Sequence, residues 1–121
     1  MRRLGLLLPS SNVVLEPLAA QLPDVSVHVS RLRVLDVTLG AASRAQFALD
    51  TQVVAARLLC DATVDAITWG GTSASWLGLD HDRRFVDRMQ QETGVRTTTC
   101  VLEINRQLER LRARRLGMVY P

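Results

Sequence analysis

The stretch "VDAITWGGTSASWLG", residues 64–78, decides how this chain is interpreted. Its first part is an apolar run that predicts a buried strand, and the second part is a loop rich in glycine and hydroxyl groups. Gly70, Gly71 and Gly78 allow unusual backbone conformations, so the loop can present N–H groups as well as hydroxyls. Such a loop suits an anion. The alternative is a strand-to-helix turn that only needs glycine conformations.

Strands and helices are predicted to alternate on both sides of this stretch. Strands are expected at residues 4–8, 25–34, 66–69, 95–98 and 115–121, and helices at residues 13–21, 44–60, 80–93 and 100–111. This alternation favours an α/β fold with a parallel sheet and helices on both of its faces. In a sheet ordered 2-1-3-4, the loop "PSSN" after the first strand and the loop "GGTSAS" after the third would share one crevice.

Length and composition limit the classes of protein to which this chain can belong. The chain has 121 residues, of which 47% are hydrophobic, and this is enough for one compact domain. No apolar run approaches the roughly 20 residues of a membrane-spanning helix, and residues 4–8 are too short for the core of a secretion signal. We therefore expect a cytoplasmic protein with no membrane partner.

The charged residues give little support to a nucleic-acid partner. All fifteen basic residues are arginine, which excludes Schiff-base chemistry by lysine. The basic run "RQLERLRARR", residues 106–115, is typical of the solvated face of a helix, and no aromatic residues accompany it. We expect no nucleic-acid binding.

The two cysteines are not in metal-ligand spacing, so no metal site is expected. Cys60 continues a helical apolar pattern and is predicted to be a buried filler. Cys100 falls where a helix begins, which can lower a thiol pKa, but a filler is favoured there too. Neither thiol is predicted to reach the crevice between the two loops. Other titratable residues expected to be structural are His28, His81, Asp80 and Asp82.

Three segments carry a resemblance to a known family. In order, "LGLLLPSSNVVLEP", "GGTSASWLG" and "TTTCVLEINRQLERLRARRLGMVYP" resemble the N-terminal half of the aspartate/glutamate racemase superfamily. The nearest branch is the maleate cis-trans isomerase and arylmalonate decarboxylase group. This resemblance implies one flavodoxin-like half of a two-domain racemase-type fold. It also implies an active site in the cleft between the halves, with no cofactor.

The resemblance further implies a carboxylate-binding site. Asn12 matches an asparagine that holds a substrate carboxylate, and Thr72 and Ser73 match hydroxyls of an enediolate pocket. Asn12 can also cap the following helix, and the two roles are compatible. The predicted substrate-binding residues are Ser10, Ser11, Asn12, Gly71, Thr72 and Ser73. Because Gly71 stands where isomerases and racemases have their first catalytic cysteine, no catalytic residue is assigned.

The sequence at the end of the chain, "RRLGMVYP", is similar to the sequence at its beginning, "RRLGLLLP". We expect residues 1–115 to form the N-terminal half-domain and residues 116–121 to begin the first strand of a missing second half. Such a truncated chain would be inactive alone, because the working cysteine of the decarboxylase branch lies in the second half. Residues 116–120 would promote self-association, giving a homo-oligomer.

The expected function is that of a cofactor-independent maleate isomerase, Asp-Glu racemase or arylmalonate decarboxylase-like enzyme. Its ligand would be a small carboxylate or dicarboxylate, converted by way of an enediolate or a cysteine-assisted step. The alternative is a non-catalytic fragment or pseudoenzyme that keeps an anion-binding pocket. A nucleotide-binding module is disfavoured, because the chain has neither a phosphate-binding P-loop nor a dinucleotide-binding glycine motif.

Overall fold

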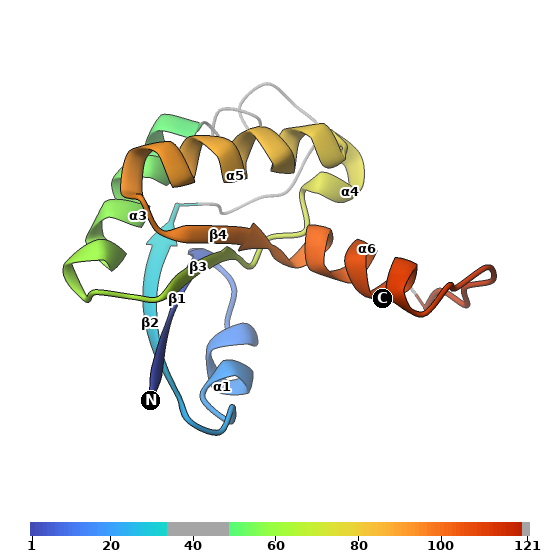
Figure 1. Cartoon of the computed structure of the whole chain (residues 1–121), viewed down its shortest axis with the longest axis horizontal. Helices are drawn as coiled ribbons and strands as arrows, with labels where there is room; N and C mark the ends of the chain where they lie inside the picture. The colour runs from blue at the N-terminus through green and yellow to red at the C-terminus, as the bar shows by residue number, and fades with distance from the viewer. Residues whose placement is uncertain (34–48, 120–121) are drawn as a thin grey trace.

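The computed structural model describes residues 1–33 and 49–119 as an α/β domain (Figure 1). Its strands are β1 (Arg2–Pro9), β2 (Val25–Leu32), β3 (Ala66–Trp69) and β4 (Arg96–Thr99). Its helices are α1 (Leu15–Ala19), α3 (Leu49–Asp61), α4 (Ala74–Leu77), α5 (Leu79–Thr93) and α6 (Cys100–Arg110).

The four strands form one parallel sheet in the order β2-β1-β3-β4, as predicted. β1 lies inside the sheet and places Gly5 between His28 of β2 and Ile67 of β3. Its continuous apolar run is buried from residue 5 to residue 8, as is typical of a strand covered on both faces. β2 alternates apolar and polar residues and forms an edge, because only one of its sides is hydrogen-bonded to another strand in this sheet.

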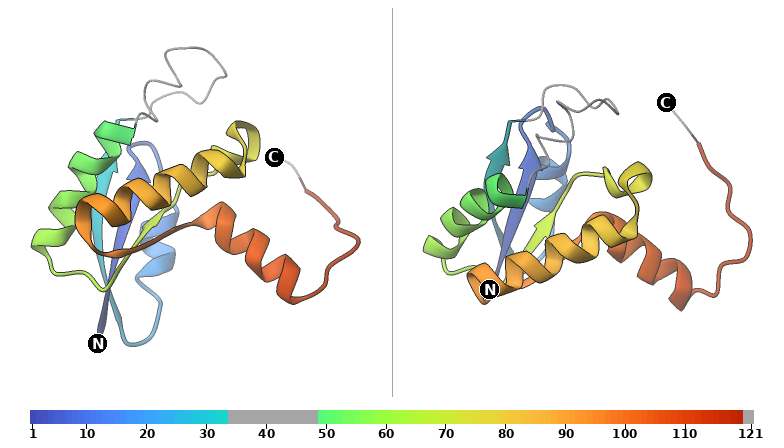
Figure 2. Two further views of the ribbon diagram at one scale, coloured as in Figure 1. Left: turned by 45° about the horizontal axis from the view of Figure 1, so that its top comes forward. Right: turned by 90° about the horizontal axis from the view of Figure 1, so that it is seen from above.

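Helices lie on both faces of the sheet (Figures 1 and 2). α3 and α5 cover one face, where Trp69 and Phe85 pack with their ring centroids 6.5 Å apart. α1 lies on the opposite face. The fully buried core residues on the α3–α5 side include Leu7, Ala56, Ile67, Trp69, Phe85 and Met89. This layering confirms the predicted fold class.

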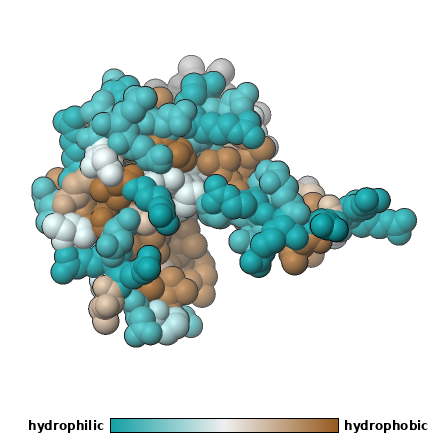
Figure 3. Space-filling model, in the orientation of Figure 1, coloured by the Kyte–Doolittle hydropathy of each residue, from teal (hydrophilic) through white to brown (hydrophobic). Residues whose placement is uncertain are grey.

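The last predicted helix forms, but none of its residues is buried. α6 has no buried residue, and Ile104 and Leu111 at its end are 56% and 70% exposed. In Figure 2 the helix projects beyond β4 rather than lying along the sheet. Figure 3 shows hydrophobic surface over α1 and the neighbouring sheet face, and hydrophilic surface over α5.

Several predicted bounds differ from the structure. The helix expected at residues 13–21 is confined to α1, and α4 forms inside the segment expected to be a loop. Residues 34–48, which include the expected start of the helix at 44–60, lie outside the described residues. Residues 113–119 form neither helix nor strand, so the strand expected at residues 115–121 is absent over the part of it that the structure describes. The proposed division at residue 115 therefore stays a prediction.

No helix among the described residues is long and apolar enough to cross a membrane.

Candidate functional site

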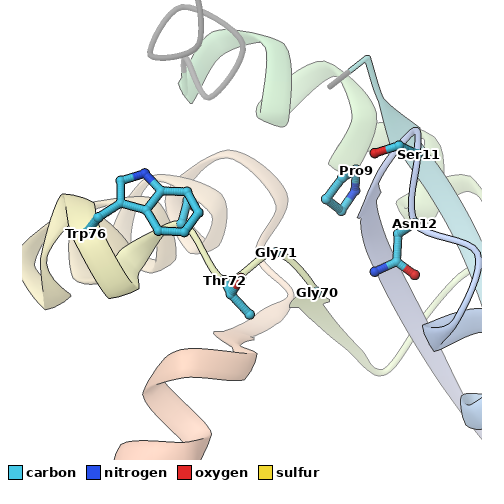
Figure 4. Close-up of a pocket in the computed structure, with 8 residues that line it drawn as sticks. Pro9, Ser11, Asn12, Gly70, Gly71, Thr72 and Trp76 are labelled. Atoms are coloured by element: carbon cyan, nitrogen blue, oxygen red, sulfur yellow. The ribbon is translucent and has the colours of Figure 1, made fainter. Parts of the chain in front are cut away.

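A cavity of about 230 Å³ opens where β1 and β3 end, between the two predicted loops (Figure 4). Its lining residues are Pro9, Ser11, Asn12, Gly70, Gly71, Thr72, Ser73 and Trp76. Five of the six predicted site residues are therefore brought together, and Ser10 is the exception. The juxtaposition follows from the sheet order, because the carboxyl ends of neighbouring parallel strands share one edge.

The first wall of the cavity is the loop between β1 and α1, and Asn12 shapes it. The side-chain oxygen of Asn12 accepts hydrogen bonds from the backbone N–H groups of Val14 (3.1 Å) and Leu15 (3.0 Å). The backbone N–H of Asn12 donates to the carbonyl of Pro9 at 3.0 Å. Asn12 thus satisfies donors at the start of α1, as short polar side chains do where helices begin.

This cap orients the Asn12 amide toward the cavity. Because only the oxygen of an amide side chain can accept hydrogen bonds, the NH₂ group must lie at the other end of the amide. Figure 4 shows the nitrogen on the side of Gly70 and Thr72, and the oxygen on the side away from them. Asn12 therefore offers N–H donors to a ligand bound in the cavity.

Ser10 ties the first wall to β2 instead of lining the cavity. Its N–H donates to the carbonyl of Leu32 at 2.6 Å, and its own carbonyl accepts from Arg31 Nη1 at 3.4 Å. Arg31 Nη1 also donates to the carbonyl of Asn12 at 2.8 Å, and Nη2 pairs with Glu16. Sequence reasoning missed Arg31 as a support of this wall, because nothing in "VSVHVSRLRV" indicates which loop that side chain crosses.

The second wall, residues 70–73, presents donors that have no partner within the described residues. The Ser73 side chain is 1% exposed, yet its hydroxyl oxygen has no hydrogen-bond partner there. The backbone N–H groups of Gly71, Thr72 and Ser73 donate no hydrogen bond within residues 1–33 and 49–119 either. A buried polar group left unpaired is uncommon and costly, so such a group in a cavity wall indicates a ligand site.

The two glycines of this wall leave no room for side chains. A Cβ atom on Gly71 would lie 2.5 Å from Cε2 and 2.7 Å from Nε1 of Trp69. A Cβ on Gly70 would lie 2.6 Å from side-chain atoms of Leu8 and Leu15. Of the two tryptophans that bracket this loop, Trp69 is therefore core. Trp76, which is 41% exposed, lines the cavity.

Cys100 lies directly behind the second wall, which sequence reasoning did not foresee. Its thiol donates a hydrogen bond to the carbonyl of Gly71, with 3.0 Å between sulfur and oxygen. Neither cysteine is among the residues that line the cavity, but the Cys100 thiol contacts the second wall from behind. The reason is that β4 pairs with β3, so the start of α6 lies beside the loop after β3.

The Cys100 thiol is not activated by its place at the start of a helix. Burial, and then the negative charge of Asp82, raise the pKa of this thiol above its ordinary value. Backbone N–H groups of Val101 and of Cys100 itself oppose this rise only in part. The thiol therefore stays protonated at neutral pH and can act as a hydrogen-bond donor.

Asp82 lies in the first turn of α5 and is buried. Its side chain is 1% exposed and accepts a hydrogen bond from the hydroxyl of Thr99. Burial raises the pKa of Asp82, while the Thr99 hydrogen bond and the nearby His81 act in the opposite direction. Asp80 is the solvated acid of this turn and pairs with Arg83 at 2.6 Å. Helical spacing alone does not tell which acid faces the core.

No charged side chain is among the eight lining residues, and none of them carries an acid, a base or a thiol. Within the part of the chain that the structure describes, no cluster of three or more histidine, cysteine or acidic residues could hold a metal ion. The site consists of neutral donors, glycine backbone and one aromatic face.

Solved structures of arylmalonate decarboxylase share this fold. The unliganded enzyme matches with a TM-score of 0.72 and 22% identity, over 92% of this chain and 46% of that chain. A liganded double mutant, with one glycine changed to cysteine and one cysteine to serine, gives a TM-score of 0.76 at 22% identity. That match covers 94% of this chain and 48% of the mutant's. A glycine-to-cysteine mutant in a sulfate-associated form gives a TM-score of 0.73 at 22% identity, over 90% of this chain and 46% of the mutant's.

These matches confirm the resemblance at the level of the fold. The chain shares the fold of one part of arylmalonate decarboxylase and spans about half the length of the structures it matches. No protein-family model matches the chain, and a sequence comparison with curated proteins finds no match.

Proposed function

We propose that this chain supplies the carboxylate-binding side of an active site that acts, without a cofactor, on a small carboxylate or dicarboxylate. The observation that carries the proposal is the Ser73 hydroxyl, which is buried in the cavity wall without a partner among the described residues. The reaction class is decarboxylation, isomerisation or racemisation at the carbon next to a carboxylate. Similarity of fold to arylmalonate decarboxylase supports this class.

The hydrogen-bond donors that line the cavity suit a small anion. The lining includes Asn12 on the first wall and Gly71, Thr72 and Ser73 on the second. Since none of the eight described lining residues is a carboxylate, none of them repels a negative ligand. Neutral hydrogen-bond donors that are fixed in place can stabilise the negative charge of a bound ligand.

The size and lining of the cavity favour a small ligand with one apolar part. Its volume of about 230 Å³ lies below the range of roughly 300–1,000 Å³ that is usual for drug-sized ligands. Pro9 and the half-exposed indole of Trp76 provide apolar surface at its edges. A malonate with an aryl or alkyl substituent has this combination of carboxylate and apolar group.

The chemistry needs a proton-transfer group from outside the lining. Loss of CO₂ or of a proton beside a carboxylate leaves an enediolate, whose negative charge these donors would stabilise. The product then needs a proton on carbon, and none of the eight lining residues can deliver it. The family resemblance implies that a cysteine of the other half-domain does so. We therefore expect the 121-residue chain to bind carboxylates weakly and to turn none of them over.

The second candidate is a non-catalytic carboxylate-binding domain. The same absence of an acid, base or thiol from the described lining favours it. The two candidates make the same prediction for binding and differ only in whether a partner half-domain restores turnover.

Binding is tested by titrating phenylmalonate, malonate and the neutral phenylmalonamide into the ¹⁵N-labelled chain. We expect both dicarboxylates to shift the amide resonances of residues 70–73 and Asn12, and the neutral amide to leave them unchanged. Ser73→Ala should weaken binding by about threefold to tenfold, the usual worth of one hydrogen bond. Ser75→Ala, at an exposed serine two residues along, is the matched control. Equal losses in the two variants, or shifts outside the cavity only, would reject the site.

Turnover is tested with maleate, aspartate, glutamate and an arylmalonate as substrates. We expect no activity above background from the chain alone. Turnover that disappears in Thr72→Ala and persists in Thr51→Ala, at an exposed threonine of α3, would show that the chain completes its own site.

A further inference from the structure

The peptide bond between Gly71 and Thr72 is held from behind by Cys100. The Cys100 thiol, on the first residue of α6, donates to the Gly71 carbonyl at 3.0 Å. This hydrogen bond joins residues 29 positions apart and connects the end of β4 to the loop after β3. It fixes the orientation of one peptide plane in the cavity wall.

The sheet order gives the direction in which that peptide points. β1 and β4 lie on opposite sides of β3, so the cavity is on the β1 side and Cys100 on the β4 side. In a planar trans peptide, the C=O and the following N–H point in opposite directions. No cis peptide bond occurs in the described residues. With its carbonyl directed at Cys100, the peptide therefore directs the Thr72 N–H toward the cavity.

The surroundings of Cys100 hold the thiol in this position. Thr99 is the N-cap residue of α6, and its hydroxyl accepts a hydrogen bond from the N–H of Leu102 at 3.1 Å and donates one to the buried Asp82. The residue before Cys100 is thereby fixed to both α5 and α6. Burial and the charge of Asp82 also raise the pKa of Cys100, so the thiol keeps the proton that it donates.

We propose that Cys100 is a positioning residue of the site, whose thiol turns the Gly71 carbonyl away from the cavity so that the Thr72 N–H donates to a bound carboxylate. The role in ligand binding rests on the proposed function, whereas the orientation of the peptide does not. The buried Ser73 hydroxyl lies next along the same wall, so the Thr72 N–H and the Ser73 hydroxyl would act as a pair.

Cys60 is the matched control, because its thiol makes a hydrogen bond of a different kind. It donates to the carbonyl of Ala56, one turn earlier in the same helix, at 3.5 Å. It is half-buried like Cys100, and its pKa is also raised by burial. Removal of the Cys60 thiol changes the cysteine content equally and leaves the cavity untouched.

The peptide orientation is tested first without any ligand. In Cys100→Ala, the Gly71 carbonyl carbon resonance should move upfield, because that carbonyl loses a hydrogen bond, and the Thr72 amide proton should move with it. Cys100→Ser restores a donor and should return both resonances toward their wild-type positions. Cys60→Ala should leave both unchanged. If Cys100→Ala does not fold by circular dichroism, Cys100→Val replaces it as the variant without a donor.

The contribution to binding is tested with phenylmalonate at neutral pH. We expect its Kd to rise by about threefold to tenfold in Cys100→Ala, as for the loss of one hydrogen bond, and to recover to within about twofold in Cys100→Ser. Cys60→Ala should bind as the wild type does. Rescue by serine separates positioning from a general loss of packing, which serine would not repair.

The outcomes separate the two proposals. If the wild-type chain binds no phenylmalonate, the proposed function fails, and the ligand-free spectra still decide the peptide orientation. Unchanged Gly71 and Thr72 resonances in Cys100→Ala would overturn the positioning role. It would also be overturned by altered resonances with an unaltered Kd, because the Thr72 N–H would then not be a ligand donor.

Discussion

The two walls of the cavity are held in place by different means. The first wall is held partly by its own residues, since Asn12 bonds to Pro9, Val14 and Leu15 within a span of seven residues, and partly by Ser10 and Arg31, which connect it to β2. The two glycines of the second wall are held by groups far away in the sequence. The Gly70 N–H donates to the carbonyl of Leu7, and the Gly71 carbonyl accepts from a thiol 29 residues away.

This difference indicates which substitutions should destabilise the site. A local cap survives changes elsewhere, because the residues that form it are neighbours in the chain. A loop held by tertiary contacts depends on the packing beneath it, here on Trp69 under Gly71 and on Asp82 and Thr99 beside Cys100. We therefore expect substitutions at and behind the second wall to have the larger effects on stability.

The largest expected effect is that of Gly71→Ala. The added Cβ would lie within 2.7 Å of the indole nitrogen of Trp69, whose ring is 1% exposed and packs against Phe85. Because that ring cannot move without disturbing the core, we expect a loss of about 2–3 kcal/mol in the free energy of unfolding, as for other overpacked interiors. Urea unfolding monitored by tryptophan fluorescence measures it.

Gly117→Ala is the control for this change. A Cβ at Gly117 meets no atom within 4 Å, so the free energy of unfolding should stay at the wild-type value. Equal stabilities of the two variants would mean that Trp69 moves aside without cost. The clash also applies to Gly71→Cys, so a thiol cannot be installed at this position without displacing the indole.

The next effect is expected at Asp82 and depends on pH. Burial raises the pKa of Asp82 in the folded state above its unfolded value, so the folded state keeps this proton to higher pH. The stability that this group contributes is fully present below the unfolded pKa of about 4 and is lost as the pH rises through the folded pKa. Asp82→Asn keeps an acceptor for Thr99 and does not ionise.

The variant should therefore gain stability relative to the wild type as the pH rises from about 4 toward neutrality. Urea unfolding of both proteins at a series of pH values gives the difference directly. Asp80→Asn, at the exposed acid of the same turn, controls for the loss of one negative charge near the start of α5. A difference that shrinks as the pH rises would contradict the assigned burial of the Asp82 charge.

The sequence predicted the fold and the first wall well, for physical reasons. Apolar runs and capping residues are local signals, so four of the five expected strands were placed to within a few residues, and their parallel arrangement followed from the alternation of strands and helices. Gly94 ends α5 in a left-handed conformation with φ of 69°, and its N–H donates to the Gln90 carbonyl, as is common for a glycine at the end of a helix. Each of these features depends on a few neighbouring residues.

The supports of the second wall could not be predicted in this way. Nothing in "TTTC" indicates that Cys100 would face Gly71, because that contact depends on the register between β3 and β4. Asp82 is buried instead of Asp80 because of the rotation of α5 about its own axis relative to the sheet, which the sequence does not indicate. The α4 turn formed within an expected loop, where tertiary packing buries Ala74 and Ser73.

The smallest expected effect on stability lies in the first wall, where Asn12 can separate its structural role from its proposed binding role. Asn12→Ala removes the oxygen that accepts from Val14 and Leu15, and should cost about 1 kcal/mol in the free energy of unfolding. Asn12→Asp keeps that acceptor, so its stability should remain near the wild-type value. It also replaces the NH₂ donor with a charged oxygen that repels an anion, so phenylmalonate binding should be lost. Gln107→Glu, which adds the same charge at an exposed glutamine of α6, should leave phenylmalonate binding unchanged. Wild-type affinity in Asn12→Asp would mean that the amide does not face the ligand, and would leave the second wall as the whole of the binding site.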